Sequence, residues 1–590
     1  MAWVQKTSPP PNRVLNFSLK DFSGGMNNRT DQLKDNEGAL VNNLMFADDT
    51  ILETRYGQKY YDDKVIDGEI IFIDEYKPYR DPNQLIRATN TEMHIGELIV
   101  PLVGKPSGVN HLGKYYFSDG KTLKVYGKFT DENSIYTRVV GESTGYDVYT
   151  IVSPAMEHEQ LPAEHTMGVK VVDHVEKTVC YEPCKNEFED TFKGACVVPD
   201  SVKYVVSHGA RLFVSGNEND DDNIFITDLQ NPIYFAVSLP LQIPPTSDKI
   251  TGLHVFDNSL IVGRENDIYV VLGSTNRHGI GVEVFSLKRL NTHTGFASHT
   301  AVDIAHNYLI FLGSDGTVYA LQNSRTNERE LATMVLSRTI DLTAEPIGLT
   351  KDDYKDAVSC FHNNEWHLSM KNKTLVYSYS HISWVMYTNL NVRSAFAIDG
   401  ELVWGRPEGR IAMFDKENFF DFGLPYQSTW YSKIFDMDDA NSFKQFREFF
   451  LVAKTFGVEY SDIYVTFEVD YAEMRDRAIV SNQISIWGKS IWGDRFINNN
   501  INESIPFVIG RRGRNIRIKV TNGYELDGVV EDYSYLENYP EKKDGLLVRL
   551  ENGENYLYMN REWLFLKGEE LNQRMKLYQI NGDYELRGKR

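Results

Sequence analysis

Short apolar runs separated by tight turns constrain the fold of this chain more than any other feature. Between residues 201 and 273, six β-branched or aromatic runs are each closed within a few residues by Gly, Pro, Asn or Asp. Such runs are typical of small antiparallel sheets joined by tight turns. Two four-stranded units in succession predict a repeated blade.

The same pattern covers most of the chain up to residue 423. Asp-Gly, Asn-Thr and similar pairs separate alternating apolar runs, which predicts hairpins. The turns recur at irregular intervals of about one propeller blade, without a WD or kelch motif. We therefore expect an all-β fold with a degenerate β-propeller of six to eight blades over residues 58–423, interrupted by an insertion at about 140–200. The hairpins predicted outside 201–273 pair 85–88 with 93–95, 114–117 with 122–126, 308–312 with 317–321, 365–370 with 374–379, and 402–405 with 410–414.

Longer alternating strands follow residue 423. Residues 462–470, 515–521 and 575–586 alternate apolar and polar side chains, which predicts a β-sandwich or platform domain over 424–590. Residues 523–568 contain their own Asn-Gly turn, so we expect a small β subdomain inserted between two paired strands. Residues 1–57 are predicted to be an arm and strand region that closes onto the propeller, with one helical turn at 35–40 because Asp35 or Asn36 can cap it.

Charge and cysteine content narrow the class of protein. The net charge of −21 weighs against a protein that binds nucleic acid by neutralising phosphates. Four cysteines in 590 residues do not make a disulfide framework. The first 20 residues lack the apolar segment of a signal peptide, and no window approaches the length of a membrane span. We expect a soluble chain that is made in the cytoplasm and has no membrane span.

One group of residues has the composition of a zinc site. His174, Cys180, Cys184 and Cys196 supply one imidazole and three thiols. These ligand types suit Zn²⁺, but the spacing differs from the usual pairs of cysteines two residues apart. A disulfide and free buried thiols are the alternatives, and free thiols are the interpretation we favour, so no cofactor or metal is expected.

Two kinds of charged cluster are candidates for other roles. Asp220, Asp221 and Asp222 could bind Ca²⁺, but they lack the alternating spacing of a calcium loop, and we favour an acidic turn at an interface or facing a channel. Basic clusters in this acidic chain are solvated turns and tails or docking patches for an acidic neighbour. The basic residues concerned are Arg511, Arg512, Arg514, Arg587, Lys589 and Arg590.

The sequence offers no catalytic motif. Carboxylates are plentiful but no pair stands out as a glycosidase pair, and the histidines fall near predicted turns or strand ends. A nucleophile elbow, an HExxH helix and a phosphate-binding glycine loop are all absent. We therefore expect a protein that is not an enzyme.

Several segments in this order resemble the β-propeller tail proteins of tailed bacteriophages. They are DFSGGMNNRTDQLKDNEGALVNNLMF, LETRYGQ, ARLFVSGNENDDDNIFITDLQNPIYF, ITGLHVFDNSLIVGRENDIYVVLG, TGFASHTAVDIAHNYLIFLGSDGTVYAL, SIWGKSIWG and the final ELRGKR. The closest functional type is the tail nozzle, or tail tubular protein B, of short-tailed phages, and the resemblance covers about residues 21–590.

The resemblance implies a structural virion protein. It would form a ring with copies of itself, commonly six-fold, between portal or adaptor proteins and tail fibres or tip proteins, and DNA would pass through the ring. Negative charge at the channel would keep DNA from adhering, since like charges repel. The alternatives are a receptor- or carbohydrate-binding propeller at the tail tip and, less favoured, a polysaccharide-degrading enzyme.

Overall fold

The structure is a computed structural model that describes most of the chain. The described residues are 14–29, 33–128, 145–153, 168–173, 177–182, 197–217, 220–229, 231–235, 240–245, 248–273, 285–290, 292–323, 331–424, 426–454, 460–481, 496–498, 505–522, 526–540, 542, 546–552, 554–559, 562–566 and 575–586.

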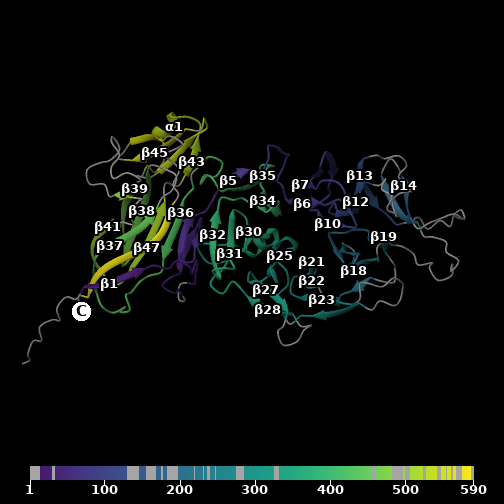
Figure 1. Cartoon of the computed structure of the whole chain (residues 1–590), viewed down its shortest axis with the longest axis horizontal. Coiled ribbons are helices and arrows are strands. Elements are labelled where there is room, and N and C mark those ends of the chain that lie inside the picture. Colours follow the sequence, from purple (N-terminus) through teal and green to yellow (C-terminus); the bar gives the residue numbers. More distant parts are fainter. Residues whose placement is uncertain are drawn as a thin grey trace, which may run out of the picture.

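Within these ranges, seven four-stranded antiparallel blades form a β-propeller (Figure 1). The first strands of most consecutive blades lie against each other, and β33 of the last blade lies against β6 of the first. The all-β propeller predicted from the sequence is confirmed. The blades are β6 (Phe72–Tyr76), β7 (Gln84–Ala88), β8 (Glu92–Ile95) and β9 (Leu98–Pro101); β10 (Ser107–His111), β11 (Lys114–Ser118), β12 (Leu123–Lys128) and β13 (Tyr146–Ile151); β16 (Tyr204–His208), β17 (Arg211–Asn217), β18 (Asp220–Asp228) and β19 (Asn231–Phe235), with β20 (Leu241–Gln242) beside β18; β21 (Ile250–Phe256), β22 (Ser259–Arg264), β23 (Ile268–Leu272) and β24 (Ser286–Arg289); β25 (Val302–Ala305), β26 (Tyr308–Leu312), β27 (Val318–Asn323) and β28 (Leu331–Val335); β29 (Val358–His362), β30 (Glu365–Met370), β31 (Lys373–Ser378) and β32 (Ser383–Thr388); and β33 (Ser394–Ile398), β34 (Glu401–Gly405) and β35 (Ile411–Asp415), completed by β5 (Gly57–Tyr60).

The innermost hairpins of five blades share one kind of turn. Both residues of the two-residue loop have positive φ in the turns Asp257-Asn258 (46° and 56°), Asn363-Asn364 (48° and 63°) and Asp399-Gly400 (50° and 78°). Leu112-Gly113 and Gly209-Ala210 occupy the same place in two further blades and also have positive φ. A two-residue turn of this hand matches the twist of the flanking strands, so the repeat is structural even where the residues differ.

The expected insertion at 140–200 extends the second blade in its described part. β13 is the outer strand of that blade, and β15 (Thr178–Glu182) pairs with it in parallel. β14 (Gly168–Asp173) pairs with β15 and brings the sheet to six strands.

A β-sandwich follows the propeller. Phe449 of one sheet and Phe467 of the other lie with ring centroids 5.2 Å apart, so the two sheets pack face to face. One sheet contains β37 (Lys444–Lys454), β41 (Ile505–Gly513) and β47 (Lys576–Leu586), together with β1 (Val14–Leu19), β3 (Leu44–Asp48) and β4 (Ile51–Thr54). The other contains β2 (Gly38–Asn42), β36 (Ser428–Ser432), β42 (Ile516–Asn522), β38 (Tyr460–Val469), β39 (Ala472–Ser481) and β40 (Phe496–Asn498).

The N-terminal strands differ from the expectation that residues 1–57 close onto the propeller. Only β5, which begins at Gly57, completes a blade; β1, β3 and β4 belong to the sandwich. The helical turn expected at 35–40 is wrong, because β2 begins at Gly38 and pairs with both β32 and β36. β2 therefore joins the sixth blade and the sandwich into one ten-stranded sheet.

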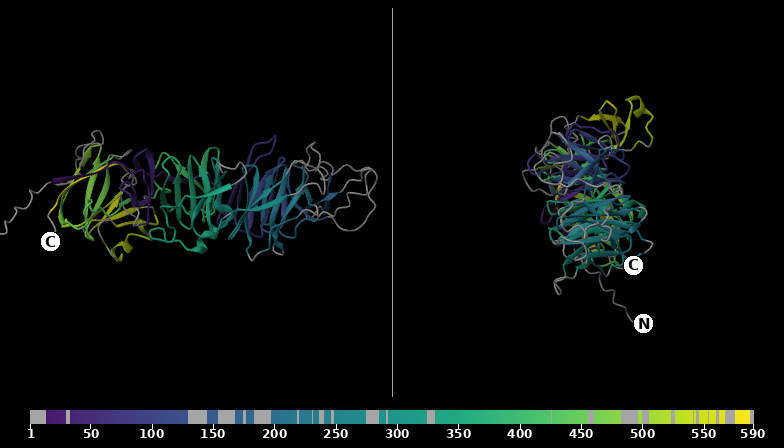
Figure 2. Two further views of the ribbon diagram at one scale, coloured as in Figure 1. Left: turned by 90° about the horizontal axis from the view of Figure 1, so that it is seen from below. Right: turned by 90° about the vertical axis from the view of Figure 1, so that its right-hand side faces the viewer.

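An inserted sheet protrudes from the sandwich (Figure 2). It consists of β43 (Leu526–Val530), β44 (Leu546–Leu550), β45 (Asn555–Met559) and β46 (Glu562–Leu566), with the short helix α1 (Ser534–Glu537). We expected the strands flanking it to pair. That expectation is wrong, because β42 and β47 lie in opposite sheets of the sandwich.

Candidate functional site: the propeller axis and the charged surfaces

Most of the proposed zinc ligands fall outside the part of the chain that the structure describes. His174, Cys184 and Cys196 lie outside it, and for Cys180 only the backbone is placed, in β15. Among the described residues, no three or more His, Cys, Asp or Glu side chains gather in a way that could hold a metal ion. The fourth cysteine, Cys360, is a buried free thiol whose pKa is raised by burial.

The acidic cluster occupies the start of a strand instead of the turn that we expected. Asp220, Asp221 and Asp222 are the first residues of β18. The Asp222 carboxylate forms an ion pair with Arg264, a fully buried residue of the next blade. Asp222 therefore contributes to the contact between the third and fourth blades.

The structure describes only one of the two basic clusters. Arg587, Lys589 and Arg590 lie outside the described residues, as do Trp487 and Trp492 of the repeated Ile-Trp-Gly. Arg511 and Arg512 are near the end of β41, and Arg514 is in the turn that leads to β42. We call Arg511, Arg512 and Arg514 the arginine turn.

Side chains from four blades meet at the centre of the propeller. The Ser107 hydroxyl of β10 lies 3.5 Å from Nε2 of His299, which is in the 3-10 turn η1 (His299–Ala301) before β25. Lys105 Nζ donates to the Thr300 hydroxyl of the same turn at 3.3 Å. The His299 ring also lies 4.9 Å from Tyr204 of β16 and stacks at 4.6 Å on His254 of β21. Because the second and fifth blades are not neighbours, these contacts bridge the propeller axis.

Burial keeps the histidines of this cluster neutral. It lowers the pKa of His299 to about 4, with a further contribution from Lys105, and it lowers the pKa of His254 well below its usual value. His299 Nδ1 and His254 Nε2 are buried without a hydrogen-bond partner among the described atoms. Both nitrogens lie within 3.4 Å of the position that a Cβ on Gly252 would occupy, so a larger residue there would press on both rings.

Among the residues that the structure describes, no third member of a hydrolytic triad accompanies this cluster. A Ser–His pair becomes a nucleophile when a third group accepts a hydrogen bond from the other imidazole nitrogen and orients the ring. Nothing described contacts His299 Nδ1 in that way. The second Ser–His pair, Ser207 Oγ and His111 Nδ1 at 2.7 Å, likewise leaves His111 Nε2 without a partner among the described atoms.

Sequence reasoning did not bring the axial residues together. The sequence places His254 and His299 near predicted turns or strand ends but does not pair them, because 45 positions separate them and they belong to different blades. The signal that could have identified them is their equivalent position in the blade repeat. Each lies close to the first strand of its blade, which is the strand nearest the axis.

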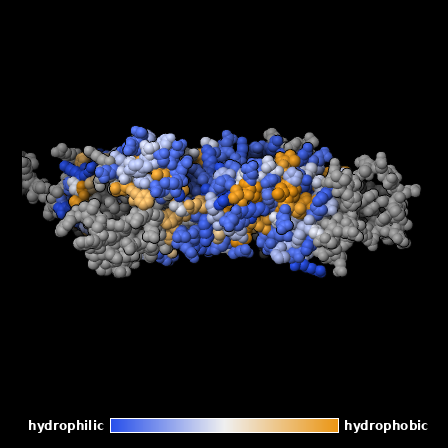
Figure 3. Space-filling model, turned by 90° about the horizontal axis from the view of Figure 1, so that it is seen from above, coloured by the Kyte–Doolittle hydropathy of each residue, from blue (hydrophilic) through white to orange (hydrophobic). Residues whose placement is uncertain are grey.

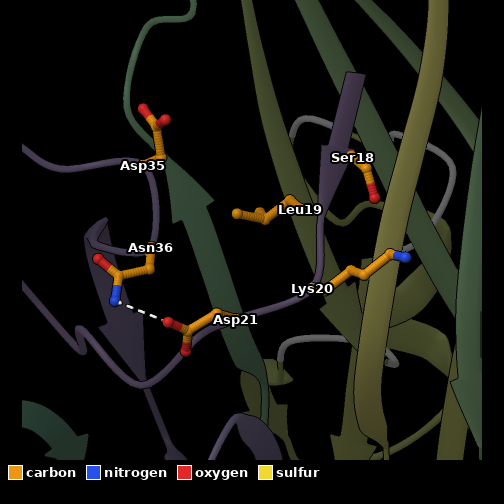
Figure 4. A pocket seen from close by; sticks show the side chains of 6 residues that line it. All are labelled: Ser18, Leu19, Lys20, Asp21, Asp35 and Asn36. Atoms are coloured by element: carbon orange, nitrogen blue, oxygen red, sulfur yellow. Dashed lines mark hydrogen bonds between the residues drawn. The ribbon is translucent and has the colours of Figure 1, made fainter. Parts of the chain in front are cut away.

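A shallow pocket lies where β1 leaves the sandwich (Figure 4). It is lined by Ser18, Leu19, Lys20, Asp21, Asp35 and Asn36. Burial raises the pKa of Asp21, but hydrogen bonds from Ser23 and from Asn36, the latter at 3.0 Å, outweigh burial and lower it. The carboxylate is therefore an ionised structural acceptor in this turn.

The remaining surface is mostly hydrophilic on the face shown in Figure 3, with hydrophobic side chains gathered near its middle. In the described ranges, no helix has the length and apolar character needed to cross a membrane.

No protein-family model and no curated protein sequence matches the chain. Solved structures with similar architecture include PorZ of Porphyromonas gingivalis, at 9% identity and a TM-score of 0.30, covering 87% of this chain and 53% of PorZ. The Pan2 WD40 domain of Neurospora crassa matches 63% of this chain and 97% of that domain, at 8% identity and a TM-score of 0.30. The extracellular domain of BT4673 from B. thetaiotaomicron matches 85% of this chain and 57% of that domain, at 10% identity and a TM-score of 0.33.

Proposed function

We propose that the chain is a structural component of a bacteriophage tail, in which several copies, commonly six, form a nozzle or hub ring. The observation that carries the proposal is the joining of propeller and sandwich into one body. A ten-stranded sheet runs from the sixth blade through β2 into the sandwich. A subunit that holds neighbouring proteins in register needs rigid β domains and lateral surfaces, and both are present here.

The axial contacts support a DNA channel between copies of the chain over a channel within one propeller. Ser107, Lys105, Thr300 and His299 bridge the propeller axis, so a duplex has no path through a single propeller. The channel of the proposed nozzle is therefore formed between copies. Part of the net charge of −21 would line it, because negative walls repel DNA and gain little from counterion release.

Quantitative mass spectrometry of purified virus particles tests the proposal. We expect peptides of this chain in the particle at several copies per tail, together with portal or adaptor proteins and fibre proteins. Absence of the chain from particles that contain their other tail proteins would contradict the proposal.

A receptor- or carbohydrate-binding role at the tail tip is the second candidate. It is favoured by the exposed ring of Tyr79, which lies over the turn at Gly113 and could stack on a sugar. Binding of host glycans that is lost in Tyr79→Ala, with the chain present as peripheral trimers, would favour this role over a ring.

A further inference from the structure

The inserted sheet is a compact unit with its own core. Leu536 of α1 is fully buried against Leu546, Val548 and Leu550, and Trp563 Nε1 donates to the Leu536 carbonyl at 2.9 Å. These contacts hold the inserted sheet together as a folded unit that projects from the sandwich. Figures 1 and 2 show it standing out from the sandwich.

The surface of the inserted sheet carries aromatic rings. Tyr533, Tyr535 and Phe565 are each between 44% and 50% exposed. The Tyr556 ring lies 5.0 Å from Tyr533 and 5.5 Å from Phe565, so three rings form a continuous row. Grouped large apolar side chains of this kind mark surfaces that other proteins cover.

The inserted sheet is also acidic. Residues 526–566 contain nine Asp or Glu and four Lys or Arg, a difference of five negative charges. Glu531, Glu551 and Glu562 are among its exposed carboxylates. An aromatic surface within an acidic rim suits a partner that presents guanidinium groups, which pair with carboxylates and stack on rings.

The arginine turn presents such groups on the same molecule. Arg512 and Arg514 lie 4.9 and 5.0 Å from the centre of the Phe443 ring, and Arg511 donates to the Ala472 carbonyl at 3.3 Å. None of the three guanidinium groups forms an ion pair with a carboxylate in the described part of the chain.

Nearby carboxylates do not neutralise the arginine turn by direct pairing. Asp470 accepts the backbone N–H groups of Arg514 and Asn515 at 3.0 and 3.1 Å. Asp439 accepts the N–H groups of Asn441 and Ser442. Asp436 and Asp438 also lie on the segment before β37.

We propose that the inserted sheet of one copy docks onto the arginine turn of the next copy. This inference rests on the proposed ring and names the contact that closes it. Two different patches on one chain make a head-to-tail contact, which produces a closed ring when the rotation between copies closes. Rows of aromatic side chains with arginine are also typical of the residues that contribute most to an interface.

Charge reversal tests the contact. The first variant carries Arg511→Glu, Arg512→Glu and Arg514→Glu; the second carries Glu531→Lys, Glu551→Lys and Glu562→Lys; the third combines all six. Native mass spectrometry and light scattering of the full chain measure assembly over a concentration series, and circular dichroism checks folding. We expect each triple variant to weaken self-association by about tenfold or more, and the combined variant to recover it. Lys351→Glu with Lys355→Glu, on the exposed 3-10 turn η2 (Lys351–Asp356), is the matched control.

A measurement on the unaltered protein keeps the test valid if a variant misfolds. Raising the salt concentration from about 0.1 to 1 M should weaken self-association, since it screens exposed charges. Rings that are indifferent to salt and to both reversals would overturn this inference and leave the proposed ring intact. A chain that stays monomeric at every concentration would count against the ring itself, and the inference would fall with it.

Discussion

The buried guanidinium of Arg55 donates two hydrogen bonds to the carboxylate of Asp421, from Nη1 to Oδ1 at 2.9 Å and from Nη2 to Oδ2 at 2.6 Å. The pair joins the segment between β4 and β5 to the segment that leaves the last blade. The Tyr426 ring lies 3.9 Å from the guanidinium carbon, and Nε donates to Asn43 Oδ1 at 2.9 Å. Arg55 therefore fixes the point at which propeller and sandwich meet.

Replacing Arg55 by Ala should destabilise the protein by about 3–5 kcal/mol, because it leaves the Asp421 carboxylate buried without its partner. Denaturant unfolding followed by tryptophan fluorescence measures the change. Lys355→Ala removes an exposed ion pair with Asp352, which solvent screens, and should leave the stability nearly unchanged. A loss in Arg55→Ala no larger than that of this control would refute the assigned role.

The stability of the propeller should depend on pH through His299. Its pKa is about 4 in the folded state against 6.5 for the unperturbed group, so the unfolded chain takes up the proton first as the pH falls. The stabilising contribution is complete above about pH 6.5 and is lost as the pH falls towards 4, by an amount on the order of 2–3 kcal/mol.

Comparing wild type with His299→Asn separates the contribution of His299 from that of groups whose effect on stability has the opposite pH dependence. Burial raises the pKa of Asp303 to about 6, so Asp303 adds stability as the pH falls through that value. The difference in unfolding free energy between wild type and His299→Asn should shift in favour of the variant between pH 7 and pH 4. Replacement of exposed His293 is the control, and parallel curves for wild type and His299→Asn would contradict the prediction.

Deleting the inserted sheet should leave the sandwich folded, although the flanking strands do not pair. The Asn522 side chain and the Met575 backbone N–H both donate to the Thr54 hydroxyl, at 3.5 and 3.0 Å, so the two ends converge on one residue. A linker of about four residues spans roughly 13 Å and should bridge them in place of 523–574. Circular dichroism and a cooperative thermal transition would show this, and an unfolded or aggregated product would disprove it.

Removing residues 575–590 should abolish the folded sandwich. β47 is an interior strand that pairs with β37 on one side and with β1 and β4 on the other, so its loss opens two edges. We expect aggregation or loss of the near-ultraviolet signal, whereas a truncation after Leu586 keeps every described pairing. A cooperative unfolding transition in the longer truncation would count against this assignment.

Local patterns predicted the fold well. The hairpin at 365–370 and 374–379 corresponds to β30 and β31, and the alternation at 575–586 corresponds to β47. Such pairings connect residues close in sequence, so turn residues and side-chain periodicity specify them.

Pairings between distant segments were missed. The capping residues at 35 and 36 favour a helical turn. The segment that follows them instead forms β2, which pairs with β32 and β36 more than 340 positions away. The Arg55–Asp421 pair spans 366 positions and has no local signal. The residues of the axial cluster are also far apart in the sequence and have no local signal. The arginine turn could be predicted because its three residues lie together in the sequence.

Electron cryomicroscopy of intact phage particles is the measurement that decides whether this chain has the proposed place in a tail. We expect several copies of the propeller and sandwich arranged as a ring around the tail axis, with a channel between copies and the inserted sheet of each copy against the next. Particles in which the chain is absent from the tail axis, or present only as separate peripheral spikes, would contradict it.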